Sequence, residues 1–98
     1  MQIEKQLTDH SLNIKLSGRL DSYTSPELEE SLFQDLDSLT DLTFDLTDLA
    51  YISSAGLRVL LLAQKAMNKQ GTMVISNASA EVKEIFDVTG FSDILTIE

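Results

Sequence analysis

The feature that most constrains the fold of this chain is an apolar strand that passes through a short turn of small residues into a leucine-rich helix. Residues 42–46 place apolar side chains at every second position, which predicts a strand with one buried face. The turn is Ser-Ser-Ala-Gly at 53–56, and apolar residues follow at helical spacing from Leu57. A strand that leads directly into a helix is typical of α/β folds with parallel strands.

Further strands are predicted on both sides of this unit. Residues 2–7 alternate loosely and indicate an edge strand, while Leu12, Ile14 and Leu16 alternate strictly and predict a second strand that ends at Gly18. The short turn at 8–10 favours an antiparallel hairpin between these two strands. Short apolar runs at 73–75 and 94–97 predict two more strands.

Helices are predicted between these strands. Thr24 stands at capping-box spacing from Glu27, and the following apolar stripe comprises Leu28, Leu32, Phe33 and Leu36. The helix after the serine turn buries Leu57, Leu60, Leu61 and Met67 and ends near Gly71. A third helix, capped by Ser79 and closed by Gly90, buries Val82, Ile85 and Phe86.

The order of these elements predicts an α/β fold in a single domain, residues 1–98. A chain of 98 residues supports one hydrophobic core. We expect a small mixed, mostly parallel β-sheet of about five strands with three or four α-helices, chiefly on one face.

The composition argues against several classes of function. A formal net charge of −9 opposes nucleic acid and anionic membranes as partners, because both are polyanions. The chain has no cysteine and one histidine, His10, so thiolate chemistry and a histidine-based metal site are not expected. The longest apolar run, 59–63, is too short to span a bilayer, and the N-terminus lacks a signal-peptide pattern. We expect a soluble, cytoplasmic chain.

The sequence carries no enzymatic motif. It has no Gly-rich phosphate loop, no dinucleotide-binding fingerprint and no His-Glu-x-x-His. Asp45 and Asp48 flank the predicted strand end without a basic or histidine partner, and we interpret them as solvated residues rather than metal ligands. No catalytic residue, cofactor or metal site is therefore expected.

The two serines of the turn, Ser53 and Ser54, are the candidate functional residues. A helix start offers unpaired N–H groups and the positive end of the helix dipole, which both favour an anion. Spacing alone favours a serine that only caps the helix. The two roles are compatible if one serine caps while the other stays exposed and accepts a phosphate.

At these residues the chain resembles the anti-sigma factor antagonist family, the single-domain members of the STAS class. The resemblance covers essentially the whole chain and rests on three ordered blocks: residues 18–21 (Gly-Arg-Leu-Asp), residues 45–46 with 51–57, and residues 82–91.

The resemblance implies that Ser54, two positions before Gly56, is the phosphate acceptor. Ser53 stands where many members of the family have aspartate, which makes it a rival acceptor. Asp21 matches an acidic residue near the family's phosphorylation site, although it also suits an ordinary turn. The partner-binding surface implied by the resemblance comprises Asp21, Ser22, Ser53, Ser54, Ala55, Gly56 and Leu57.

The function implied by the resemblance is partner switching without catalysis by this chain. The dephosphorylated form would bind an anti-sigma factor serine kinase and release a sigma factor. Phosphorylation at Ser54 would end that complex, and a 2C-type serine phosphatase would reset it. The alternative is a non-switching STAS binding subunit of a transporter or sensory complex, and a small hydrolase or nucleotide-binding enzyme is a third, weaker hypothesis.

Overall fold

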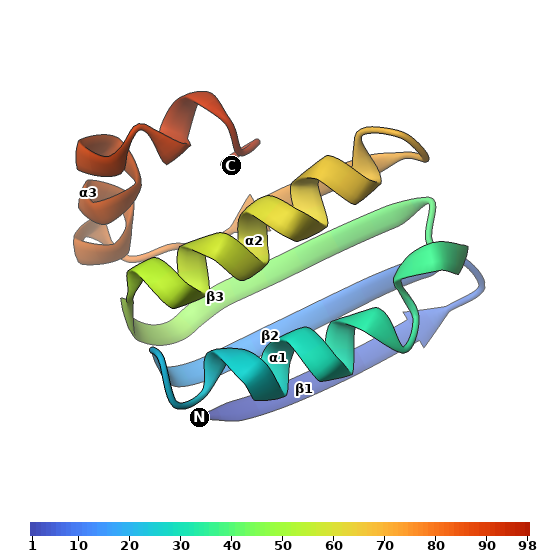
Figure 1. The fold of residues 1–98 in the computed structure, drawn as a ribbon, viewed down its shortest axis with the longest axis horizontal. Helices are drawn as coiled ribbons and strands as arrows, with labels where there is room; N and C mark the ends of the chain where they lie inside the picture. The colour runs from blue at the N-terminus through green and yellow to red at the C-terminus, as the bar shows by residue number, and fades with distance from the viewer.

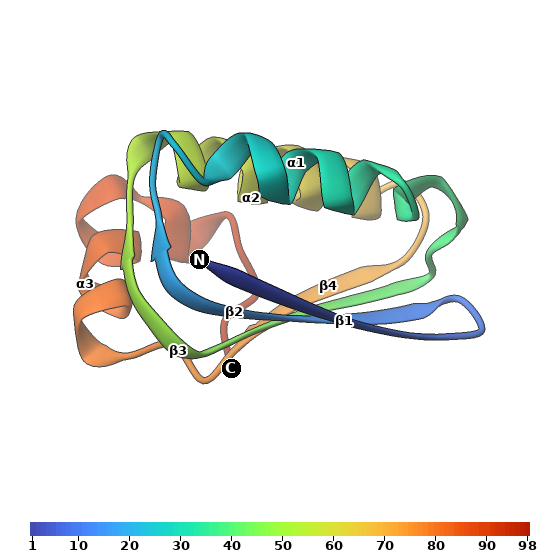
Figure 2. The same ribbon diagram turned by 90° about the horizontal axis from the view of Figure 1, so that it is seen from below.

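The computed structural model describes all of residues 1–98 and places two helices side by side over one face of a sheet (Figures 1 and 2). The strands are β1 (Gln2–Thr8), β2 (Ser11–Leu20), β3 (Asp41–Ile52) and β4 (Thr72–Ser76). The helices are α1 (Ser25–Phe33), α2 (Ser54–Met67) and α3 (Ala80–Thr89), with short 3-10 turns η1 (Leu36–Ser38) and η2 (Phe91–Asp93). None of the helices is long and apolar enough to cross a bilayer.

The four strands lie in the order β1-β2-β3-β4. β1 and β2 pair antiparallel, while β2 with β3 and β3 with β4 pair parallel. The hairpin turn contains Asp9 at a φ of 56°, a conformation that aspartate tolerates better than most residues. The predicted fold class is therefore confirmed, as are the hairpin and the predominance of helices on one face (Figure 2).

The predicted fifth strand at 94–97 forms only a single bridge, between Ile75 and Ile97. The amides of Ile94 and Leu95 both donate to the Phe91 carbonyl, so the backbone is still turning where the strand was expected. Only the end of the chain reaches β4: the Ile75 amide donates to the Thr96 carbonyl and the Glu98 amide to the Ile75 carbonyl, each at 2.8 Å.

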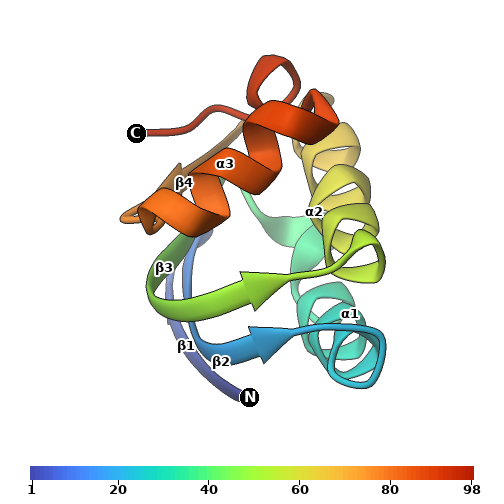
Figure 3. The same ribbon diagram turned by 90° about the vertical axis from the view of Figure 1, so that its left-hand side faces the viewer.

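β2 and β3 continue past their predicted ends and bend together toward the helices (Figures 2 and 3). Their register shifts twice, between Lys15 and Ser17 and between Gly18 and Arg19, and each time β3 contains the extra residue. Extra residues of this kind increase the local bend of a strand. Gly18 continues β2 at a φ of 93° rather than ending it, a conformation that favours glycine.

The core fills the space between the sheet and the two long helices. β2 and β3 contribute fully buried side chains such as Ile14, Phe44 and Leu46, against which α1 packs Leu28 and Leu32. The predicted helical stripes differ from the structure at three residues, Phe33, Leu61 and Ile85, and Ile85 of α3 is only partly buried. Phe33 is 50% exposed because α1 ends there, so that Leu36 is buried from η1 instead. Leu61 of α2 is only partly buried.

Of the helix caps predicted at Thr24 and Ser79, the one at Ser79 forms and the one at Thr24 does not. Thr24 precedes α1 but makes no side-chain capping bond, because its hydroxyl is engaged by the loop before the helix. Ser79 caps α3 as predicted, since its Oγ accepts from the Val82 amide at 3.2 Å. Gly90 closes α3 in the left-handed conformation, and Val82 and Phe86 are fully buried.

The bend at Gly18 yields a stability prediction. Gly18→Ala should lower the free energy of unfolding by about 1–2 kcal/mol, because an L-residue is strained at this φ. Ser17→Ala, one position earlier in β2, is the control and should change it by less than about 0.5 kcal/mol. Urea denaturation of both variants checks this, and equal effects at the two positions would contradict the role given to Gly18.

Candidate functional site

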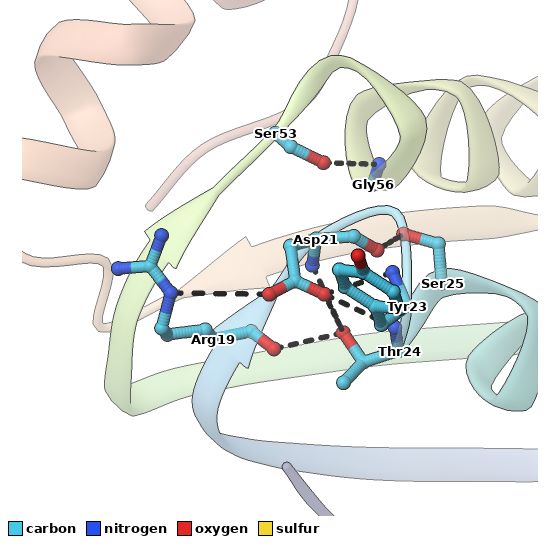
Figure 4. A network of polar contacts seen from close by, with 7 residues as sticks. All are labelled: Arg19, Asp21, Tyr23, Thr24, Ser25, Ser53 and Gly56. Carbon is cyan, nitrogen blue, oxygen red and sulfur yellow. Dashed lines mark hydrogen bonds and ion pairs between the residues drawn. The ribbon is translucent and has the colours of Figure 1, made fainter.

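The candidate site lies where β2 and β3 end, next to the start of α2. The Ser53 amide donates to the Leu20 carbonyl at 2.8 Å, which joins the ends of the two strands. The loop after β2 and the turn after β3 therefore leave the sheet next to each other, at the end of the molecule that faces the viewer in Figure 3. Residues far apart in sequence, from 19–25 and 53–56, are brought together there (Figure 4).

The two serines of the turn have different environments. Ser53 is the N-cap of α2: its backbone is extended, and its Oγ accepts from the Gly56 amide at 3.4 Å (Figure 4). Ser54 is the first residue of the helix, is exposed, and its hydroxyl makes no hydrogen bond within the chain. The structure thus has one serine capping the helix and one serine free beside it.

Gly56 holds the start of α2 against the strand ends. A Cβ atom added there would lie 2.7 Å from Leu20 Cγ and 2.9 Å from Ile52 Cγ1, both belonging to fully buried side chains. Only a glycine permits this approach. Leu57, the next residue, is 5% exposed and packs into the core, so Gly56 and Leu57 position the predicted surface rather than form it.

Asp21 organises the loop between β2 and α1 (Figure 4). Its Oδ1 accepts hydrogen bonds from the amides of Tyr23 at 3.0 Å and Thr24 at 3.1 Å. The Thr24 hydroxyl accepts from the Asp21 amide at 2.9 Å and donates to the Arg19 carbonyl at 2.8 Å. Ser25 Oγ closes the loop by donating to the Asp21 carbonyl at 2.5 Å. These bonds support the turn interpretation of Asp21.

The same bonds keep Asp21 ionised. The Thr24 amide lowers the pKa of the carboxyl below its ordinary value of 3.8, helped by the Tyr23 amide, the Thr24 hydroxyl and the Arg19 charge and opposed by desolvation. The Arg19 Nε lies 3.8 Å from Asp21 Oδ2, and its guanidinium stacks 4.3 Å from the centre of the Tyr51 ring. The site therefore has a fixed negative charge on one side of the serine turn.

A shallow hollow of about 230 Å³ connects the two loops across the surface. Serine side chains and Pro26 line it from the α1 side, and Ala55, Arg58 and Val59 line it from α2. Arg58 is exposed and forms no ion pair. Ser22 and Ala55, two of the predicted partner-binding residues, therefore border a common concave surface.

The chain is similar to known proteins of one family. The sequence model of the family described as "STAS domain" matches residues 2–98. The chain belongs to the STAS domain family. It is 34% identical over 101 residues to the "Anti-sigma-B factor antagonist" of Listeria monocytogenes, covering 100% of this chain and 87% of that protein. To the protein of the same description from Bacillus subtilis it is 30% identical over 98 residues, covering 99% and 90%.

Solved structures agree on the fold of this STAS domain. The Bacillus cell fate determinant SpoIIAA in its phosphorylated form superimposes with a TM-score of 0.78 at 16% identity, covering 99% of this chain and 91% of that one. At this identity the likeness concerns the fold alone. The family resemblance inferred from the sequence is confirmed by the family match and by the curated relatives.

Asp45 and Asp48, the other two acidic residues considered in the sequence, lie elsewhere in the STAS domain, and Asp48 has a basic partner that was not expected. Asp45 and Asp48 belong to the interior of β3 rather than to its end. Asp45 accepts from the Thr47 hydroxyl at 2.6 Å and from Asn77 at 3.2 Å, while Asp48 pairs with Lys15 at 3.4 Å. No group of three or more His, Cys, Asp or Glu side chains is arranged to hold a metal ion.

Two features of the site were not predicted from the sequence. Tyr23 is 91% exposed on the loop that Asp21 organises, and Arg58 lies in the hollow one helical turn after Ser54. Tyr23 offered a signal, because it is an aromatic residue between polar turn formers. Arg58 offered none, since an arginine on the outer face of a helix is ordinary.

The close approach at Gly56 generates a prediction. Gly56→Ala should reduce the free energy of unfolding by about 1–3 kcal/mol through overpacking, although alanine is the better helix former. Ser54→Ala, two positions earlier on the exposed surface, is the control and should change it by less than about 0.5 kcal/mol. Chemical denaturation measures both, and a stabilised Gly56→Ala variant would show that α2 does not rest on Leu20 and Ile52.

A pH prediction follows from Asp21. Because its pKa is lower in the folded chain than the ordinary 3.8, the unfolded chain takes up the proton first as the pH falls. The stabilisation by Asp21 is complete above the ordinary pKa of 3.8 and is lost as the pH falls through the lower pKa of the folded chain. Asp21→Asn should therefore lose less stability than the wild type on acidification below pH 3.8. Thermal melting across this range checks it, and parallel curves would be the contrary result.

Proposed function

We propose that this STAS domain is an anti-sigma factor antagonist controlled by phosphorylation of Ser54. In its dephosphorylated form it binds an anti-sigma factor that is also a serine kinase, and the sigma factor is released. The observation that supports this most directly is the exposed, unpartnered Ser54 hydroxyl at the start of α2. The curated relatives described as anti-sigma-B factor antagonists support the same class of partner.

Phosphorylation is a transfer from the kinase to this chain, which itself supplies only the acceptor oxygen. The Ser54 Oγ forms a bond to the γ-phosphorus of ATP, the bond to ADP breaks, and the hydroxyl proton leaves with a base of the kinase. ATP and magnesium belong to the kinase. The reverse step is hydrolysis by a 2C-type serine phosphatase, which returns the hydroxyl and inorganic phosphate. In this proposal the cycle runs in the cytoplasm, where a sigma factor acts.

Ser54 suits the acceptor role better than Ser53. Ser53 is half-buried and its Oγ accepts the hydrogen bond that caps α2, so a phosphate there would disturb the helix start. Ser54 is exposed, and a phosphate on it would lie beside the free N–H groups of the first turn and the positive end of the helix dipole. The folded domain can therefore accept the charge without rearrangement.

The switch is electrostatic and steric. A phosphate adds about −1.5 to −2 charges at neutral pH to a chain that already carries −9. Like charges placed against each other at an interface cost several kcal/mol, and each 1.4 kcal/mol is about a tenfold change in affinity. A single phosphate is therefore sufficient to end the complex. A protein of this fold, SpoIIAA, has been solved in a phosphorylated form, which supports a fold compatible with the modification.

The proposal is tested by incubating the chain with ATP and the anti-sigma kinase encoded nearest to it. Peptide mass spectrometry should find one phosphate, on Ser54. Ser54→Ala should remain unmodified and bind the kinase constitutively, and Ser54→Asp should bind more weakly with an unchanged circular dichroism spectrum.

Other outcomes would correct this proposal or count against it. A phosphate on Ser53 would keep the switch and correct the acceptor. No phosphate, with the kinase active on itself, would favour the non-switching binding subunit, for which the absence of aspartate at position 53 leaves room. Recovery of transport subunits alone in a pull-down would favour that alternative directly.

A further inference from the structure

Tyr23 is the most exposed large apolar side chain of the molecule. It is 91% exposed, and its hydroxyl makes no hydrogen bond within the chain. A tyrosine ring left in water is a large apolar surface that gains nothing from the fold of its own chain, but it can contribute substantially to an interface. Any apolar contact that the Tyr23 ring makes is therefore made with a partner.

The backbone that carries Tyr23 is held in place from both sides. The Tyr23 amide donates to Asp21 Oδ1 at 3.0 Å, and the next residue, Thr24, is fixed by four hydrogen bonds to Asp21 and Arg19 (Figure 4). A side chain presented by a fixed backbone loses little conformational freedom on binding, since a tyrosine has only two rotatable side-chain angles. Tyr23 is thus preorganised for contact with a partner.

The position of Tyr23 connects it with the serine turn. Its loop leaves β2 at Leu20, whose carbonyl is bonded to the Ser53 amide, and the hollow beside it is shared by Ser22 and Ala55. A partner that places an active site over Ser54 therefore covers the Asp21–Thr24 loop as well. Tyr23 itself does not line that hollow.

We propose that Tyr23 is the aromatic anchor through which the anti-sigma serine kinase binds this domain, by inserting its ring into an apolar pocket of the kinase. This inference rests on the proposed function and adds to it a division of roles. Tyr23 sets the strength of the complex, because its ring is buried in it, and Ser54 sets the switch. Exposed tyrosines in such positions are frequent hot spots of interfaces.

Binding of variants to the kinase tests the anchor. Tyr23→Ala should weaken binding of the dephosphorylated domain by about tenfold or more, whereas Tyr23→Phe, which keeps the ring, should stay within about threefold of the wild type. Phe33→Ala is the matched control, because Phe33 is another exposed ring, at the opposite end of α1 (Figure 1). It should bind like the wild type. Thermal melting should show Tyr23→Ala to be as stable as the wild type.

The kinetics of phosphorylation distinguish a binding role of Tyr23 from a purely structural one, because only a binding role changes KM without changing kcat. Tyr23→Ala should raise the KM of the kinase for this substrate and leave kcat unchanged, because the ring makes the same contact in the ground state and the transition state. Wild-type affinity in Tyr23→Ala, or a loss in Tyr23→Phe as large as in Tyr23→Ala, would overturn the anchor and leave the proposed function intact. A wild-type chain that does not bind the kinase at all would overturn both.

Discussion

The close contact between the first turn of α2 and the ends of β2 and β3 determines the arrangement of the site. At Gly56 the helix approaches Leu20 and Ile52 so closely that no side chain fits between them. The bend of the two strands brings their ends to the level of the helices (Figure 2). Because the strand ends are also joined by the bond from the Ser53 amide to the Leu20 carbonyl, two loops that are remote in sequence form one surface.

That surface separates structural tasks from exposed groups. Ser53 caps the helix and Asp21 holds the neighbouring loop, so Ser53 Oγ and Asp21 Oδ1 are each engaged in hydrogen bonds within the chain. Ser54 and Tyr23 are exposed, and neither hydroxyl has a partner. The chain therefore presents an exposed serine and an exposed aromatic ring on a backbone that is already fixed. Under the proposed function, a phosphate changes what a partner meets without any need to change the fold.

Much of this architecture could be predicted from local patterns, and the failures have physical causes. Strict alternation at Leu12, Ile14 and Leu16 identified β2, and Ser79 with Gly90 bounded α3. The full length of β3 was missed because its two extra residues break the alternation that marks a strand. Thr24 looked like a cap, but its hydroxyl bonds to Arg19 and Asp21, a contact that helix spacing does not encode. The exposure of Tyr23 likewise could not be predicted, because it depends on the conformation that these bonds give to the loop.

The most direct test is to measure the affinity of the anti-sigma kinase for one preparation of the domain before and after phosphorylation, with an NMR spectrum of each form. We expect the phosphorylated domain to lose affinity by about a hundredfold or more, which corresponds to two steps of 1.4 kcal/mol. Amide shifts should change only around residues 21–24 and 53–58. Equal affinity for the two forms, or a loss that accompanies shift changes throughout the core, would contradict a switch that acts on the surface of a fixed fold.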